Sequence, residues 1–176
     1  MNPSAPSIRD FLHQVTFLQD LDDQTLSIFA SLLVSKTIKS GSVIFRELDD
    51  SDALYIVERG QVVISKHVRG DVDIVLTRFK PGDFFGEMGL FDAAPRSATA
   101  HAESETALWQ LSRHAFEQIF SDHPEMAARI CYRLVTIFIQ RLRATNEQAR
   151  EAVRWGLEAT GYSPEGTPVA FGRKST

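Results

Sequence analysis

The residues best suited to chemistry lie in one short stretch, residues 85–99. It reads Phe85-Gly86-Glu87-Met88-Gly89-Leu90 and, five residues later, Pro95-Arg96-Ser97-Ala98-Thr99. The glycines let the backbone turn tightly and bring its N–H groups close to a ligand, and a helical turn beginning there directs several N–H groups at an anion. Arg96 supplies a countercharge whose planar fork matches a phosphate with two non-bridging oxygens. The stretch therefore predicts an anion site.

Glu87 narrows the kind of anion. A carboxylate repels a free anion, but it is also a pure hydrogen-bond acceptor and can take a bond from a sugar hydroxyl some ångströms from the phosphate. A phosphorylated ribose therefore fits better than free phosphate or sulfate. The alternative, in which Gly86 and Gly89 are turn glycines and Arg96 is a surface charge, does not explain this combination at this spacing.

The elements that position this stretch begin with helices over residues 7–33. Apolar residues recur there at helical spacing, and Asp22 or Asp23 is a suitable N-cap for the second helix. The apolar positions are Ile8, Phe11, Leu12, Leu26, Phe29, Leu32 and Leu33.

Residues 34–111 change to short β-rich runs divided by glycine turns. The turns are Ser40-Gly41, Arg59-Gly60, Arg69-Gly70 and Pro81-Gly82. Alternation at Val72, Ile74 and Leu76, and again at Ala107, Trp109 and Leu111, predicts strands with one face in water. The fold class is α+β: an antiparallel β-roll, a jelly-roll-like sandwich, with N-terminal helices and a long C-terminal helix.

Helical periodicity returns after Ser112, first over residues 113–120 and then in one long helix over residues 122–159. The long helix spans roughly 55 Å, too long to lie wholly on so small a domain. We divide the chain into a leader with the first helix (1–16), the β-roll with flanking helices (17–121), the long helix (122–159) and a flexible, glycine- and proline-rich tail (160–176).

Phe85 to Thr99 resembles the phosphate-binding cassette of the cyclic nucleotide-binding domains, found in catabolite-activator proteins and protein kinase A regulatory subunits. The similarity includes Leu54-Tyr55-Ile56-Val57 with Gly60, and Pro81-Gly82-Asp83-Phe84, and covers about residues 17–145. A departure is Leu48-Asp49-Asp50-Ser51, where relatives usually have glycine, which puts the geometry of that turn in doubt.

The resemblance implies a role for each matching residue. Arg96 and the N–H groups of Gly89 and Ser97, with Met88 in the same loop, would hold the cyclic phosphate of cAMP or cGMP. Glu87, helped by Gly86, would take the ribose 2′-hydroxyl. Two residues from the strands, Ile64 and Leu76, would line the pocket beside the base.

The preferred base is left open. Ser97 matches the serine of bacterial catabolite activators, which favour cAMP, but a hydroxyl there serves either ligand. Thr145 follows Arg141-Leu142-Arg143-Ala144 as in the catabolite-activator helix, so Thr145, with Asn146 from a partner chain, would contact the base. The alternative is that Thr145 is only a spacer in a helix seam.

The long helix carries a heptad-like seam that predicts a homodimer. The seam residues are Ala128, Cys131, Val135, Phe138, Leu142, Thr145, Ala149, Ala152 and Gly156. The alternative is a monomer, with the first half packed on the roll and the rest a solvated helix.

Composition narrows the class of function further. A net charge of -4 and only 17 residues after Ala159 argue against a DNA partner or a helix-turn-helix, and no apolar run reaches the length of a membrane span. We expect a cytoplasmic, non-catalytic sensor without a cofactor or metal, acting on an unidentified effector protein.

Two alternatives stay open beside the sensor. One is a fold of this family that has lost its ligand or binds another nucleotide, such as a cyclic dinucleotide, and acts as an interaction module. The other is a cupin-like metal enzyme, which needs clustered histidines, whereas the histidines of this chain are scattered. They are His13, His67, His101, His114 and His123.

Overall fold

The computed structural model describes residues 7–69 and 72–159. It divides into two compact parts, one ending at Leu134 and one beginning at Val135, and each part is described by itself. The predicted tail, residues 160–176, lies outside the described residues.

The chain begins with two helices whose first turns are capped by side chains. Helix α1 (Ile8–Leu12) has a reciprocal capping box between Ser7 and Asp10, and helix α2 (Asp23–Ser31) starts at Asp22, whose carboxylate accepts from the Thr25 N–H. Both helices bury apolar side chains in the core, including Leu12 and Phe29. The prediction of helices here, with Asp22 as the N-cap, is confirmed.

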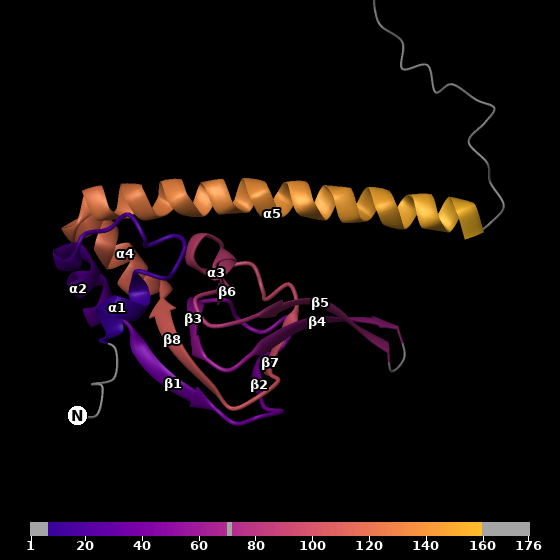
Figure 1. Ribbon diagram of the computed structural model, residues 1–176, viewed down its shortest axis with the longest axis horizontal. Helices are drawn as coiled ribbons and strands as arrows, with labels where there is room; N and C mark the ends of the chain where they lie inside the picture. The colour runs from indigo at the N-terminus through magenta and orange to yellow at the C-terminus, as the bar shows by residue number, and fades with distance from the viewer. Residues whose placement is uncertain (1–6, 70–71, 160–176) are drawn as a thin grey trace, which may run out of the picture. The chain divides into compact units, whose positions relative to one another are not determined.

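Over the part of the chain that the structure describes, eight strands form two antiparallel four-stranded sheets (Figure 1). One sheet has the order β1-β8-β3-β6 and the other β2-β7-β4-β5. The strands are β1 (Val34–Ile38), β2 (Val43–Phe45), β3 (Ala53–Arg59), β4 (Val62–Arg69), β5 (Val72–Phe79), β6 (Phe84–Phe85), β7 (Thr99–Ala102) and β8 (Thr106–Ser112). The predicted antiparallel β-roll is confirmed.

Glycine sets the sharpest turns between these strands. Gly41, Gly60 and Gly82 all have positive φ angles, of 76°, 90° and 88°. Gly60 also has no room for a side chain, since a Cβ there would lie 2.5 Å from the Glu105 carbonyl oxygen. The turn signals at Gly41, Gly60 and Gly82 are thus confirmed, whereas Gly70 of the fourth signal lies outside the described residues.

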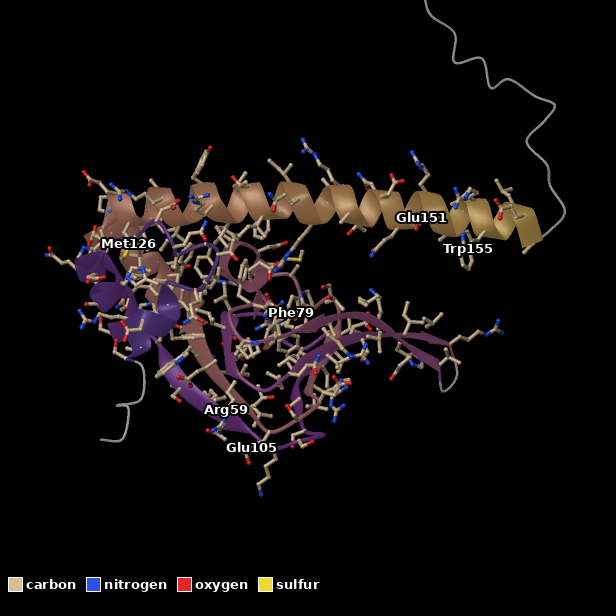
Figure 2. The ribbon with its side chains drawn as sticks, viewed as in Figure 1. Arg59, Phe79, Glu105, Met126, Glu151 and Trp155 are labelled. Carbon is tan, nitrogen blue, oxygen red and sulfur yellow. The ribbon has the colours of Figure 1, made fainter. Side chains whose placement is uncertain are left out.

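Aromatic and aliphatic side chains from both sheets fill the interior of the roll. Phe85 stacks on Tyr55, with ring centroids 5.4 Å apart, and on Phe79, at 5.6 Å (Phe79 is labelled in Figure 2). Val57 and Leu108 are fully buried in the same cluster. Because Phe85 ends β6, this core fixes the point from which the next loop starts.

Two strands differ from the predicted pattern of one wet face. Every residue of β5 up to Arg78 is exposed, so the apolar residues of this strand meet water on both faces. β5 forms a hairpin with β4 at the edge of its sheet (Figure 1), and residues 66–69 of β4 are exposed as well. In β8 the opposite occurs: Leu108 and Leu111 point to opposite faces and both are fully buried. The prediction of one water-exposed face, made from the alternating apolar residues, is therefore wrong for both β5 and β8.

Helix α4 (Arg113–Asp122) follows β8 directly, with the Ser112 hydroxyl accepting from the Ala115 N–H. Helix α5 (Pro124–Ala159) has 36 residues. The boundary differs from the predicted start at residue 122, because Asp122 ends α4 and Pro124 opens α5, where a residue without an N–H fits the first turn.

The first turns of α5 pack into the first compact part. Met126, Ile130 and Leu134 are buried, and Arg133 forms an ion pair with Asp20. The next part of the helix, residues 135–159, consists of half-buried and exposed positions only. Within residues 7–69 and 72–159, no helix combines the length and apolar composition that crossing a membrane requires.

Candidate functional site

The loop that follows β6 is built on glycine. Gly86 has a φ of +74°, in the left-handed region that favours glycine. A Cβ at this position would lie 2.7 Å from Nη1 of Arg96 and 3.0 Å from the Ala53 carbonyl oxygen. The position therefore demands glycine for both its backbone conformation and its close approach to Arg96.

The predicted helical turn is present as α3 (Met88–Phe91), with Glu87 as its N-cap residue. Glu87 is buried, at 8% exposure, whereas Met88 is 60% exposed. The Gly89 N–H donates to the Gly86 carbonyl oxygen at 3.1 Å, which differs from the prediction that this N–H points to a ligand. A turn this short closes on itself, so its N–H groups are partly used within it.

Arg96 is directed into this loop and is almost fully buried, at 4% exposure. Its Nη1 donates to the Gly86 carbonyl oxygen at 3.0 Å and its Nη2 to the Ala53 carbonyl oxygen at 2.9 Å. The guanidinium lies over the Phe45 ring, 4.2 Å from the ring centroid. The two residues that sequence analysis expected to meet, Gly86 and Arg96, are in direct contact.

The charge on Arg96 is poorly compensated where it lies. The Asp52 carboxylate is 3.9 Å from Nη2, at the edge of ion-pair range, and Nε is buried with no hydrogen-bond partner. Burial lowers the pKa of Arg96, while Tyr55, Asp52 and Glu87 oppose that shift. A buried cation with an unsatisfied N–H is costly, and an anion brought to it would recover that cost.

The backbone of Arg96 is held by the turn before β3. The Leu48 N–H donates to the Arg96 carbonyl oxygen at 2.9 Å, and the Arg96 N–H donates to the Asp49 carbonyl oxygen at 2.8 Å. Leu48 has a φ of +71°, a left-handed conformation that glycine adopts more easily. The departure noted in the sequence is thus a leucine in a glycine conformation, and the turn forms nevertheless.

The other predicted residues lie around this centre. Ser97 is exposed, and its carbonyl oxygen accepts from Lys66 Nζ at 3.2 Å. Ile64 is half-buried in β4, opposite Ala100 of β7. Leu76 is 49% exposed on β5, so any contact it makes with a base stays a prediction.

Thr145 and Asn146 lie in the second compact part, in the portion of α5 after Val135. Both are exposed, and the Thr145 hydroxyl donates to the Arg141 carbonyl oxygen at 2.9 Å. This bond is the usual one for threonine within a helix. Their contact with the base stays a prediction.

Sequence analysis missed three residues that shape the site: Phe45 beneath the guanidinium, Asp52 beside it, and Arg113, which binds α3 from outside. Arg113 Nε donates to the Gly89 carbonyl oxygen at 2.7 Å. The signal for Asp52 was present, since it precedes the Leu54-Tyr55 run. Phe45 and Arg113 carried no local signal because their role depends on long-range packing.

The described residues also bear on metal chemistry. Nowhere in residues 7–69 and 72–159 do three or more histidine, cysteine, aspartate or glutamate side chains gather in a way that would hold a metal ion.

The residues at the centre of this site lie within a region that matches a known protein family. The family described as the cyclic nucleotide-binding domain matches residues 35–123, about half of the chain. The matched region includes the loop after β6, Arg96 and every strand of the roll, except that it lacks the first residue of β1.

Relatives of two kinds share this sequence. A cAMP-dependent protein kinase regulatory subunit from Blastocladiella emersonii is 28% identical over 82% of this chain and 36% of its own length. A CRP-like cAMP-activated global transcriptional regulator from Mycobacterium tuberculosis is 26% identical over 82% of this chain and 62% of its own length. The chain thus spans less than two thirds of either relative.

Solved structures share the fold. The Thermus thermophilus catabolite activator protein superposes with a TM-score of 0.71 at 26% identity, covering 78% of this chain and 63% of its own. The regulatory domain of Toxoplasma gondii PKA, solved with cAMP, gives a TM-score of 0.58 at 35% identity, covering 63% of this chain and 42% of its own.

Proposed function

The chain belongs to the cyclic nucleotide-binding domain family, and from that premise we propose that it is a non-catalytic sensor that binds cAMP or cGMP and regulates a separate protein. The two relatives described above are a regulatory subunit of a cAMP-dependent kinase and a transcriptional regulator activated by cAMP. Both are regulators, which supports a regulatory role for this chain.

The observation that carries the proposal is the state of Arg96. Its guanidinium is 4% exposed, contacts the glycine loop and has a buried Nε without a hydrogen-bond partner. A cyclic phosphodiester carries one negative charge and two non-bridging oxygens, which match the charge and the fork of one arginine. If Arg96 exchanged the carbonyl oxygens of Gly86 and Ala53 for a phosphate, its guanidinium would bond to a charged acceptor in place of neutral ones.

Glu87 supports a nucleotide over a bare phosphate. It is 8% exposed at the start of α3 and close enough to raise the pKa of Arg96 by its charge. A buried carboxylate beside the site repels a free phosphate ion, but it accepts a hydrogen bond from a ribose 2′-hydroxyl. The ligand class that satisfies both residues is a cyclic nucleotide with a free 2′-hydroxyl.

The second compact part supports the mode of signalling. Two apolar residues of the predicted seam, Val135 and Leu142, are exposed. We propose that the seam packs against the same helix of a second copy, and that Thr145 and Asn146 reach the base in that dimer. Contacts made in only one arrangement of the helices would let the ligand shift the population between arrangements.

Calorimetric titration of the purified chain with cAMP and with cGMP tests the proposal. We expect binding at micromolar or lower concentration for at least one of them, together with a rise in melting temperature, since a ligand that binds only the folded state stabilises it. A titration with 2′-deoxy-cAMP is the matched control for Glu87 and should give weaker binding. Absence of heat and of a thermal shift with both nucleotides would remove the assignment.

A further inference from the structure

Arg113, the first residue of α4, joins three segments of the chain. Its guanidinium donates to the carbonyl oxygens of Gly89 and Asp92, each at 2.7 Å, and to that of Ser51. Its backbone N–H donates to the Asp52 carbonyl oxygen at 2.6 Å. One residue thus fastens α3, the turn before β3 and the start of α4 to one another.

Helix α3 depends on such external support. It has four residues, a single turn, and a helix this short is unstable in water by itself. Its last carbonyl groups have no partner further along the helix and carry partial negative charge, so a cation placed there is favourable. The Arg113 guanidinium lies at that end of α3, whose own four residues include no charged side chain.

One of the carbonyl groups that Arg113 binds belongs to Gly89, which lies beside Arg96. A Cβ on Gly89 would lie 2.5 Å from Ser51 Oγ and 3.2 Å from Arg96 Nη1, so Gly89 packs closely against both Ser51 and that end of the guanidinium. Ser51 is itself buried, at 8% exposure. A shift of either residue would therefore change the space around Arg96.

We propose that Arg113 is a positioning residue of the nucleotide site: it touches no ligand but holds α3 and Ser51 in the geometry that seats the phosphate beside Arg96. The proposal rests on the proposed function for its ligand. Because Arg113 is also the first residue of α4, the same bonds couple the position of residues 89–92 to that helix, so that neither moves independently of the other.

The test uses the full chain with Arg113→Gln and Arg113→Lys, and with Arg59→Gln as the matched control, since Arg59 pairs with Glu105 on the surface (both are labelled in Figure 2). Two measurements are made on each variant: calorimetric affinity for cAMP and cGMP, and hydrogen exchange of the nucleotide-free protein. For Arg113→Gln we expect about tenfold weaker binding and faster exchange of the amides of residues 86–92. Lysine keeps the charge but forms fewer bonds, so it should restore part of both effects.

The results separate this proposal from the function on which it rests. If the parent chain binds neither nucleotide, the proposed function fails, while faster exchange confined to residues 86–92 still supports the positioning role of Arg113. If the parent chain binds and Arg113→Gln changes neither affinity nor exchange, the positioning role is refuted and the function stands. Faster exchange spread equally over β1, β3 and β8 would also refute it, because Arg113 would then be a general stabiliser.

Discussion

The loop after β6, residues 86–96, and the second part of α5, residues 135–159, differ in which kind of side chain they bury. In the loop, the polar residues Arg96 and Glu87 are buried, and Arg96 is bound to the backbone carbonyl oxygens of Gly86 and Ala53. In residues 135–159, apolar residues such as Leu142 and Trp155 are exposed, at 62% and 70%. The loop is nearly complete within one chain and needs one small anion, whereas the helix surface needs a second apolar surface. A sensor requires both: a site that is already shaped, and an element whose packing can still change.

Replacement of Arg96 by leucine tests the loop most directly. It removes the buried cation and its fork, each charge-assisted bond of which contributes about 1.5 to 3 kcal/mol. We expect nucleotide binding to weaken by about 3 kcal/mol or more, a factor of at least about 150, measured by calorimetry at constant salt.

The matched control for this change is Arg59→Leu, because Arg59 is exposed and pairs only with Glu105 at the surface. Its affinity should equal that of the parent chain. An Arg96→Leu variant that folds and binds the nucleotide with undiminished affinity would refute the phosphate role.

Replacement of Gly86 by alanine tests how tightly the loop is packed around Arg96. The added methyl would lie 2.7 Å from Arg96 Nη1 and 3.0 Å from the Ala53 carbonyl oxygen, so the guanidinium must move. We expect a loss of about 2 kcal/mol in the free energy of unfolding from this overpacking, measured by urea denaturation, and weaker nucleotide binding besides.

Gly41→Ala is the matched control, since Gly41 also has a positive φ, of 76°, but no atom lies within 4 Å of its Cβ position. Both variants share the backbone strain, so the difference between them isolates the contact with Arg96. Equal losses in the two variants would contradict the packing argument.

The loop could be predicted from the sequence because its function depends on local residue types. Glycines that must turn, a helical turn and an arginine ten residues after Gly86 are all visible as a pattern, and Gly86 and Arg96 do meet, at 3.0 Å. The same holds for the turn glycines Gly41, Gly60 and Gly82, since positive φ is a property of single residues.

Features set by distant contacts could not be predicted. Phe45 lies beneath the guanidinium and Arg113 binds the end of α3, yet neither stands near the loop in the sequence. The faces of β5 were misjudged for a related reason: alternation reports which residues share a face but not whether another layer covers that face. Packing against distant segments decides this, and in β5 neither face is covered up to Arg78.

Leu142→Lys tests the helix side of the comparison. The residue is 62% exposed, so the fold of one chain should tolerate the change, but a charge in a dimer seam would disrupt packing between copies. We expect the parent chain to be a dimer by light scattering and the variant to dissociate more readily, by about 1.5 kcal/mol per protomer.

Gln140→Lys is the matched control, because Gln140 is exposed on the same helix but outside the seam. It should leave the dimer intact. A parent chain that is monomeric at every concentration would refute the predicted dimer seam. The exposed apolar surface of the helix would then need a partner other than a second copy of this chain.

The smallest effect concerns Tyr55, whose ring lies 5.8 Å from the Arg96 guanidinium. Burial raises the pKa of Tyr55 above its ordinary value of 10.0, although the Arg96 charge opposes the shift. Because the pKa of Tyr55 is raised in the folded state, the phenol loses its proton at a lower pH in the unfolded chain than in the folded protein. The stability that the neutral phenol provides is therefore fully present below the ordinary pKa of tyrosine. It is lost as the pH rises from that value through the pKa of the folded state. We therefore expect the free energy of unfolding to fall less steeply with pH in Tyr55→Phe than in the parent chain, as measured by denaturation across the alkaline range. Identical slopes for the two proteins would mean that the Tyr55 phenol beside Arg96 is as accessible to water in the folded protein as in the unfolded chain, which would contradict the burial on which the comparison rests.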